Sequence, residues 1–205
     1  MTPAEFNERL EMLLRLIGWG LQYYKVWIRL RFHEEEKVGW SLEEQNRAAA
    51  PFNAFFVAVS SAALDMALLQ FAKVLDTDSR TASLIILMRA AKADAKLVPH
   101  ITPSELVQAS KTLGESKKIA TELKRRRNQE VAHADASPAP PVSNIKKKDF
   151  DQLIERIDGA FQVLHRGHHN SKVGWRILVS EVDRDTLSLL EVLVAESRAS
   201  ARERV

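Results

Sequence analysis

Three short segments have the sequence of a helix N-terminal capping motif, and they constrain the fold of this chain more than any other feature. Each places a hydroxyl side chain three residues before a glutamate: Thr2 before Glu5, Ser41 before Glu44, and Thr102 before Glu105. In such a capping box the hydroxyl accepts a hydrogen bond from the third amide of the helix, and the glutamate accepts one from the amide of the capping residue. The sequence therefore predicts helices that begin at these three points.

Residues that interrupt helices are scarce. The chain has only 7 glycines and 7 prolines in 205 residues, which favours long helices over many short strands. Apolar residues recur every three or four positions from residue 3 to 37, so a long N-terminal helix is expected there. Further helices are expected over 42–75 (with a break near Pro51), 82–97, 103–132, 149–165 and 183–199. The predicted fold is an all-α helical bundle that forms a single domain over residues 1–205.

The composition limits the kinds of metal site the chain can form and indicates the cellular compartment in which it acts. The sequence contains no cysteine, which excludes disulfides and cysteine-ligated zinc or iron–sulfur centres and fits a reducing cytosol. The N-terminus lacks the basic-then-apolar layout of a signal peptide. The longest uncharged stretch, residues 48–64, is shorter than the roughly 20 residues that span a bilayer, and we interpret it as a buried core helix. We expect a soluble cytoplasmic protein without a membrane partner.

A run of basic residues lies in the second half of the 103–132 segment. Its members are Lys117, Lys118, Lys124, Arg125, Arg126 and Arg127. Such a run can follow the phosphates of a nucleic acid, in this case RNA, or it can be an ordinary solvated helix face. A proline-rich stretch, residues 135–143, follows as a loop.

Two stretches resemble the abortive-infection protein U family, a HEPN-like group. They are LLQFAKVLDTDSRTASL, residues 68–84, and RNQEVAHAD, residues 127–135. HEPN ribonucleases carry an arginine, commonly followed by a polar residue such as asparagine, and then a histidine after four to six intervening residues. Here Asn128 follows Arg127, and five residues separate Arg127 from His133. The resemblance spans about residues 42–165 and implies a HEPN-like core over about 42–170, with the 3–37 helix and the 183–199 helix on either side.

The resemblance implies a catalytic set of Arg127, Asn128 and His133. Histidine can transfer protons near neutral pH because its ordinary pKa is roughly 6.5. Arginine offers phosphate a planar fork of donors, and asparagine can orient a hydroxyl without adding charge. Because one motif has only one histidine, the resemblance also implies a homodimer that pairs two motifs. The expected function is a metal-independent, cofactor-free endoribonuclease of the abortive-infection or toxin type in phage defence, with a cognate antitoxin protein as a further partner.

Alternatives remain at this level. The chain can be a non-catalytic dimeric module that binds RNA or protein, or a structural adaptor in which the arginine and histidine only cap a helix. On a regular helix Arg126, not Arg127, shares a face with His133, whereas the family pattern favours Arg127. His165 and His169 have the spacing of zinc ligands, but no carboxylate completes a site, so we interpret them as a solvated helix end without a metal.

Overall fold

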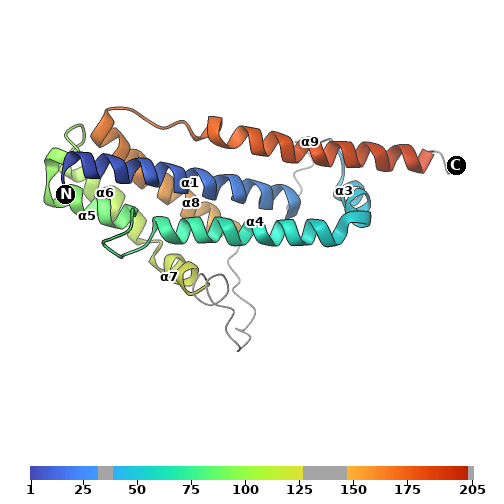
Figure 1. Ribbon diagram of the computed structural model, residues 1–205, viewed down its shortest axis with the longest axis horizontal. Helices are drawn as coiled ribbons and strands as arrows, with labels where there is room; N and C mark the ends of the chain where they lie inside the picture. The colour runs from blue at the N-terminus through green and yellow to red at the C-terminus, as the bar shows by residue number, and fades with distance from the viewer. Residues whose placement is uncertain (32–38, 127–146, 203–205) are drawn as a thin grey trace. The chain divides into compact units, whose positions relative to one another are not determined.

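The computed structural model describes residues 1–31, 39–126 and 147–202, and in these ranges every regular element is a helix (Figure 1). The predicted all-α class is therefore confirmed. Contacts divide the chain into two compact units, and each unit is built from two separate segments. Unit 1 comprises Met1–Ile17 and Leu68–Gly174, and unit 2 comprises Gly18–Ala67 and Trp175–Val205. A single domain over residues 1–205 stays a prediction.

Unit 1 carries most of the residues that bear on function. Its elements are the first half of α1 (Pro3–Arg31), the end of α4 (Asn53–Val74), α5 (Leu84–Ala93), the 3-10 helix η2 (Ala95–Leu97), α6 (Pro103–Gly114), α7 (Lys117–Arg126) and α8 (Lys147–His169). Its core contains the largest fully buried side chains, among them Phe6, Phe71, Met88, Leu123, Phe150 and Phe161. The rings of Phe71 and Phe150 meet edge to face with centroids 5.5 Å apart, so α4 packs against α8 at this point.

The three predicted capping boxes are all present. The amide of the capping residue donates to the glutamate at 2.7 Å for Thr2, 2.8 Å for Ser41 and 2.8 Å for Thr102. In return each hydroxyl accepts from the glutamate amide at 3.2–3.3 Å. These local bonds were predictable because both partners lie within one helical turn of sequence.

The expected continuous helix over residues 103–132 is wrong in its middle. α6 ends at Gly114, and α7 begins at Lys117 after a short break. Ser116 in the break is buried, and its hydroxyl accepts a 3.3 Å hydrogen bond from Arg156 of α8. Glycine weakens a helix, and this contact with α8 stabilises the break, so α7 starts in a new direction. The part of the basic run that the structure describes, residues 117–126, therefore belongs to a helix of its own.

Unit 2 contains the rest of α1, α3 (Leu42–Ala49), the 3-10 helix η1 (Ala50–Phe52), the start of α4 and α9 (Trp175–Arg202). The predicted break near Pro51 is confirmed, because Pro51 lies in η1. A small core joins α3 to α9, which lie side by side in Figure 1; it includes Trp40, Ala48, Leu190 and Val194. Arg29 of α1 makes a bidentate ion pair with Asp183 of α9, at 2.6 and 2.9 Å.

The first half of α4 does not fit the expected buried core helix. Phe52 just before it and Phe55 within it are 51% and 58% exposed. Within the described chain, Leu42–Val74 is the stretch whose length and composition would allow it to cross a membrane, yet only 28% of its most apolar window is buried. The interpretation of residues 48–64 as a buried core helix is therefore wrong for most of this stretch. An apolar run is equally compatible with burial in a core and with burial against a partner, and sequence alone does not separate the two.

Candidate functional site

The three residues expected to carry catalysis, Arg127, Asn128 and His133, lie outside the described residues, as does the side chain of Arg126. The backbone of Arg126 forms the last residue of α7. The structure therefore describes the surface that leads up to the motif. That surface is formed by α7 and by the elements that pack against it.

The basic residues of α7 lie on two neighbouring stripes. Residues at positions i, i+4 and i+7 share a helix face, so the stripes comprise Lys117, Thr121 and Lys124 on one side and Lys118, Glu122 and Arg125 on the other. Leu123 is completely buried and anchors the opposite face of the helix. The four described basic side chains of the run, Lys117, Lys118, Lys124 and Arg125, are thus not on one continuous stripe.

The second stripe is partly neutralised. Arg125 donates to both carboxylate oxygens of Glu122, at 2.6 and 3.1 Å, and both side chains are only about one-third exposed. A paired and half-buried guanidinium has fewer donors left for phosphate. Within the described part of the chain, Lys117 has no salt-bridge partner, so the first stripe keeps more of its positive charge.

The first stripe borders a cleft of about 530 Å³ between the end of α4, α5, α6 and α7. Its floor is apolar and includes Leu75, Met88 and Leu113, each at most 8% exposed. Its lining also contains four basic side chains, Arg89, Lys92, Lys117 and Lys124, and one carboxylate, Asp76. We name this the α5–α7 cleft. An apolar floor under a cationic rim suits a ligand that has both an apolar body and a negative charge.

The acidic turn after α4 lies at the edge of this cleft. Asp76 and Thr77 line it, and the Asp76 carboxylate accepts hydrogen bonds from the amides of Thr77 and Asp78, at 2.7 and 3.2 Å. Hydrogen bonds from Arg80 lower the pKa of the Asp78 carboxyl to about 2, so this turn stays negatively charged at neutral pH. The structure thus brings the first of the two resembling stretches beside the helix that leads into the second.

A search for similar proteins identifies the family of this chain. The model of the HEPN_AbiU2 family, described as AbiU2, matches residues 3–188. The chain belongs to the AbiU2 family. The match extends the resemblance beyond residues 42–165, so the N-terminal helix and the first half of α9 are part of the family region. No curated protein and no solved structure matches this AbiU2 chain significantly.

Two residues of the cleft in this AbiU2 chain were missed from sequence. Arg89 and Lys92 lie on the exposed side of α5, three positions apart, and both line the cleft. Lys92 donates a 2.7 Å hydrogen bond to Ser110 of α6, which holds its ammonium group at the junction of the two helices. Their helical spacing was visible in the sequence. Their proximity to α7 was not, because it depends on the break after Gly114.

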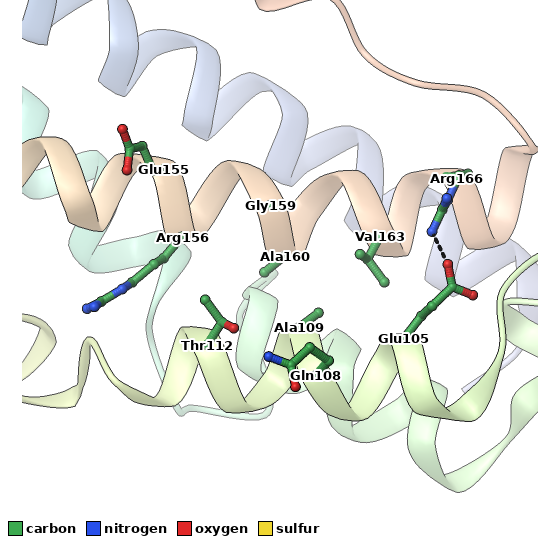
Figure 2. Close-up of a pocket in the computed structure, with 10 residues that line it drawn as sticks. All are labelled: Glu105, Gln108, Ala109, Thr112, Glu155, Arg156, Gly159, Ala160, Val163 and Arg166. Atoms are coloured by element: carbon green, nitrogen blue, oxygen red, sulfur yellow. Dashed lines mark hydrogen bonds and ion pairs between the residues drawn. The ribbon is translucent and has the colours of Figure 1, made fainter.

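A second hollow lies between α6 and α8, and both of its arginines make ion pairs (Figure 2). Arg166 bonds Glu105 at 2.5 Å across it, and Arg156 reaches Glu115 at 3.3 Å. Small side chains form its floor, including Ala109 and Ala160, with Gly159 between the charged ends in Figure 2. We interpret this groove of the AbiU2 chain as the packing seam between α6 and α8, because its two arginines are paired with a glutamate of α6 and with the glutamate that directly follows this helix.

The histidines at the end of α8 differ in how closely they are packed. His168 hydrogen-bonds the carbonyl of Leu97 at 2.7 Å and lies 5.2 Å from the ring of Phe6, and His165 contacts the carbonyl of Ser171 at 3.0 Å. The His165 bond is at an exposed position and His169 is exposed, as expected for a solvated helix end, whereas His168 between them is partly buried. Among the described residues, no three His, Cys, Asp or Glu side chains lie so that they could hold a metal ion.

Proposed function

We propose that this AbiU2-family protein is a metal-independent endoribonuclease that acts in phage defence. The observation that carries the proposal is the position of α7. Its unpaired basic stripe borders a cleft, and the helix ends one residue before the Arg127-Asn128 pair of the HEPN motif. A strand whose phosphates follow this stripe would be delivered to the motif.

The chemistry requires no bound ion. The 2′-hydroxyl of the substrate attacks the adjacent phosphorus, the bond to the 5′-oxygen breaks, and the products are a 2′,3′-cyclic phosphate and a 5′-hydroxyl. One imidazole accepts the 2′-proton and a second donates a proton to the leaving oxygen. Arg127 stabilises the charge that builds on the phosphate, and Asn128 orients the attacking hydroxyl. The two imidazoles are His133 of each subunit in a homodimer.

A direct assay tests the proposal. Purified protein incubated with total RNA should cut it in the presence of EDTA, and the 5′ fragments should end in 2′,3′-cyclic phosphates. DNA of the same sequence should remain intact because it lacks the attacking hydroxyl. If activity vanishes in EDTA and returns with a divalent cation, the metal-independent mechanism is wrong. If RNA binds but is never cut, the non-catalytic RNA-binding alternative replaces the enzyme.

We propose that the exposed start of α4 forms the dimer interface in this function. Phe52 and Phe55 lie three residues apart and are 51% and 58% exposed, next to other apolar residues of unit 2. Burial of such side chains against a second copy removes them from water, at about 25 cal/mol for each Å² buried. Glutamate at both positions should convert a dimer into a monomer.

Light scattering measures this change directly. The parent should have about twice the 23.2 kDa chain mass, and the Phe52→Glu/Phe55→Glu variant should have the mass of one chain. Val107→Glu is the matched control, because Val107 on α6 in unit 1 is 57% exposed and outside the interface. A double variant that stays dimeric would show that the subunits meet elsewhere.

A further inference from the structure

We propose that the α5–α7 cleft binds one unpaired nucleotide of a single-stranded RNA, with the base on the apolar floor and the phosphates at the basic rim. This inference rests on the proposed action on RNA and adds a specific site, a preference for unpaired strands, and two residues, Arg89 and Lys92. The base and the phosphate are argued separately below, because different parts of the cleft hold them.

The rim of the cleft provides cations from two helices. Arg89 and Lys92 come from α5, and Lys117 and Lys124 come from α7. Within the described ranges Arg89 and Lys117 have no salt-bridge partner, and Lys92 is held by a neutral hydroxyl, that of Ser110. Cations on both sides of one cleft neutralise successive phosphates of a strand better than a single helix face does.

The negative charges near the rim are already engaged. The one carboxylate that lines the cleft, Asp76, accepts amides of its own turn at 2.7 and 3.2 Å. Asp78 lies close enough to Lys124 for the lysine charge to lower its pKa slightly, but its main partner is Arg80, at 2.7 Å. The one negative charge of the lining therefore belongs to the turn after α4, and the charged side chains that α5 and α7 contribute to the lining are all positive.

The floor provides a surface for a flat base. Leu75, Met88 and Leu113 are buried beneath it, and Ile85 and Ala120 form its sides. A thioether and aliphatic groups can lie against the face of an aromatic ring, as they do in small-molecule sites. The volume, about 530 Å³, falls within the range of such sites. The floor cannot be read from the sequence of the basic run, because its residues come from α5, α6 and the end of α4.

The depth of the floor selects for single strands. Bases in a duplex are stacked and paired, so their faces cannot reach a recessed apolar surface, whereas an unstacked base can. Thr77, Ser110 and Thr121 add hydroxyls at the cleft wall that can bond the edge of a base or the ribose. Lys124 lies three residues before Arg127, so a strand seated here continues toward the motif along the chain.

The floor can be tested without changing charge. A Cβ built on Gly114, which lines the cleft, meets nothing within 4 Å, so Gly114→Leu should fold and fill the space where a base would lie. Gly159→Leu is the matched control, because Gly159 has the same open surroundings and lines the α6–α8 groove instead. For the rim, Lys92→Ala is compared with Lys111→Ala, an exposed lysine of α6 outside the cleft.

Binding is measured by fluorescence anisotropy in a His133→Ala background, so that the probe is not cut. The probes are a short labelled single-stranded RNA and a duplex of the same sequence. Gly114→Leu should lower the affinity for the single strand about tenfold, about 1.4 kcal/mol, at an unchanged salt dependence. Lys92→Ala should reduce the slope of log affinity against log salt by about 0.7, the value for one phosphate contact on a single strand. Both controls should bind as the parent does, and melting temperatures confirm that each variant is folded.

The results of these measurements can reject the nucleotide site and the ribonuclease activity independently of each other. Equal single-strand affinities for Gly114→Leu and Gly159→Leu would show that no base enters the cleft, even if the parent protein cuts RNA. If the parent protein binds single strands through the cleft but cuts no RNA, the proposed ribonuclease activity is wrong and the proposed binding site is supported. If Lys92→Ala and Lys111→Ala have the same slope of log affinity against log salt, Lys92 of α5 does not contact an RNA phosphate.

Discussion

Replacing His133 with alanine should lower the rate of RNA cleavage by roughly 10²–10⁴-fold, the usual contribution of a positioned acid–base group. The loss should fall on the chemical step, because an imidazole that moves a proton contributes little to binding the strand. Affinity for RNA, the dimer mass and the melting temperature should therefore stay close to those of the parent. Single-turnover cleavage together with anisotropy measures the two effects separately.

Two adjacent arginines provide the matched comparison for this prediction. Arg127→Ala should also reduce cleavage by orders of magnitude, because its guanidinium is proposed to stabilise the charged phosphate. Arg126→Ala should mainly weaken binding, since Arg126 is the last residue of the basic helix α7. The reverse ranking, with Arg126 essential and Arg127 dispensable, would contradict the assignment and favour a helix that continues to His133. A His133→Ala protein that cuts normally would remove the proposed mechanism altogether.

Replacing Gly167 with leucine should create a clash in unit 1 that costs roughly 3 kcal/mol, at the upper end of the usual cost of overpacking a core. A Cβ at this position would lie 2.9 Å from the Cβ of Val98 and 2.9 Å from Cδ1 of Ile101. The isoleucine terminus can rotate away, but the Val98 Cβ is attached to the backbone and cannot. The Gly167 carbonyl also accepts a 3.0 Å hydrogen bond from the amide of His100, so the two segments are held at this separation.

Gly159→Leu on the same helix is the control for this prediction. Both substitutions gain about 1 kcal/mol of helix propensity, so the difference between them reports the clash alone. The difference corresponds to a melting temperature lower by roughly 6–12 °C for Gly167→Leu in a chain of this size. Equal melting temperatures for the two variants, by circular dichroism or calorimetry, would contradict the close packing of α8 against the segment before α6.

Features that depend on neighbouring residues in the chain were predictable from sequence. The helix starts at Thr2, Ser41 and Thr102 each need only a hydroxyl, a glutamate and one turn of helix between them. The break at Pro51 follows from the missing amide of one residue. The family resemblance depended on short motifs of the same kind, and the AbiU2 match over residues 3–188 confirms it.

Features that depend on distant residues were not predictable. The expected single helix over residues 103–132 is interrupted after Gly114, where Ser116 accepts a hydrogen bond from Arg156 of α8, 40 residues away in the chain. The burial of the first half of α4 was predicted wrongly, because an apolar composition is the same whether a core or a partner covers it. The residues expected to carry catalysis lie outside the described ranges, and their roles stay predictions.

The sequence by itself determined that this chain is helical, where its capped helices begin, and which family it belongs to, because capping, propensity and motif spacing are encoded within a few residues. Tertiary structure alone decided which charges meet. Lys92 of α5 and Lys117 of α7 are 25 positions apart, yet they line one cleft because α7 takes a new direction after Gly114. Packing decides which of the basic residues in a run are exposed together on one helix face. In α7 the buried face is fixed by apolar residues such as Leu123.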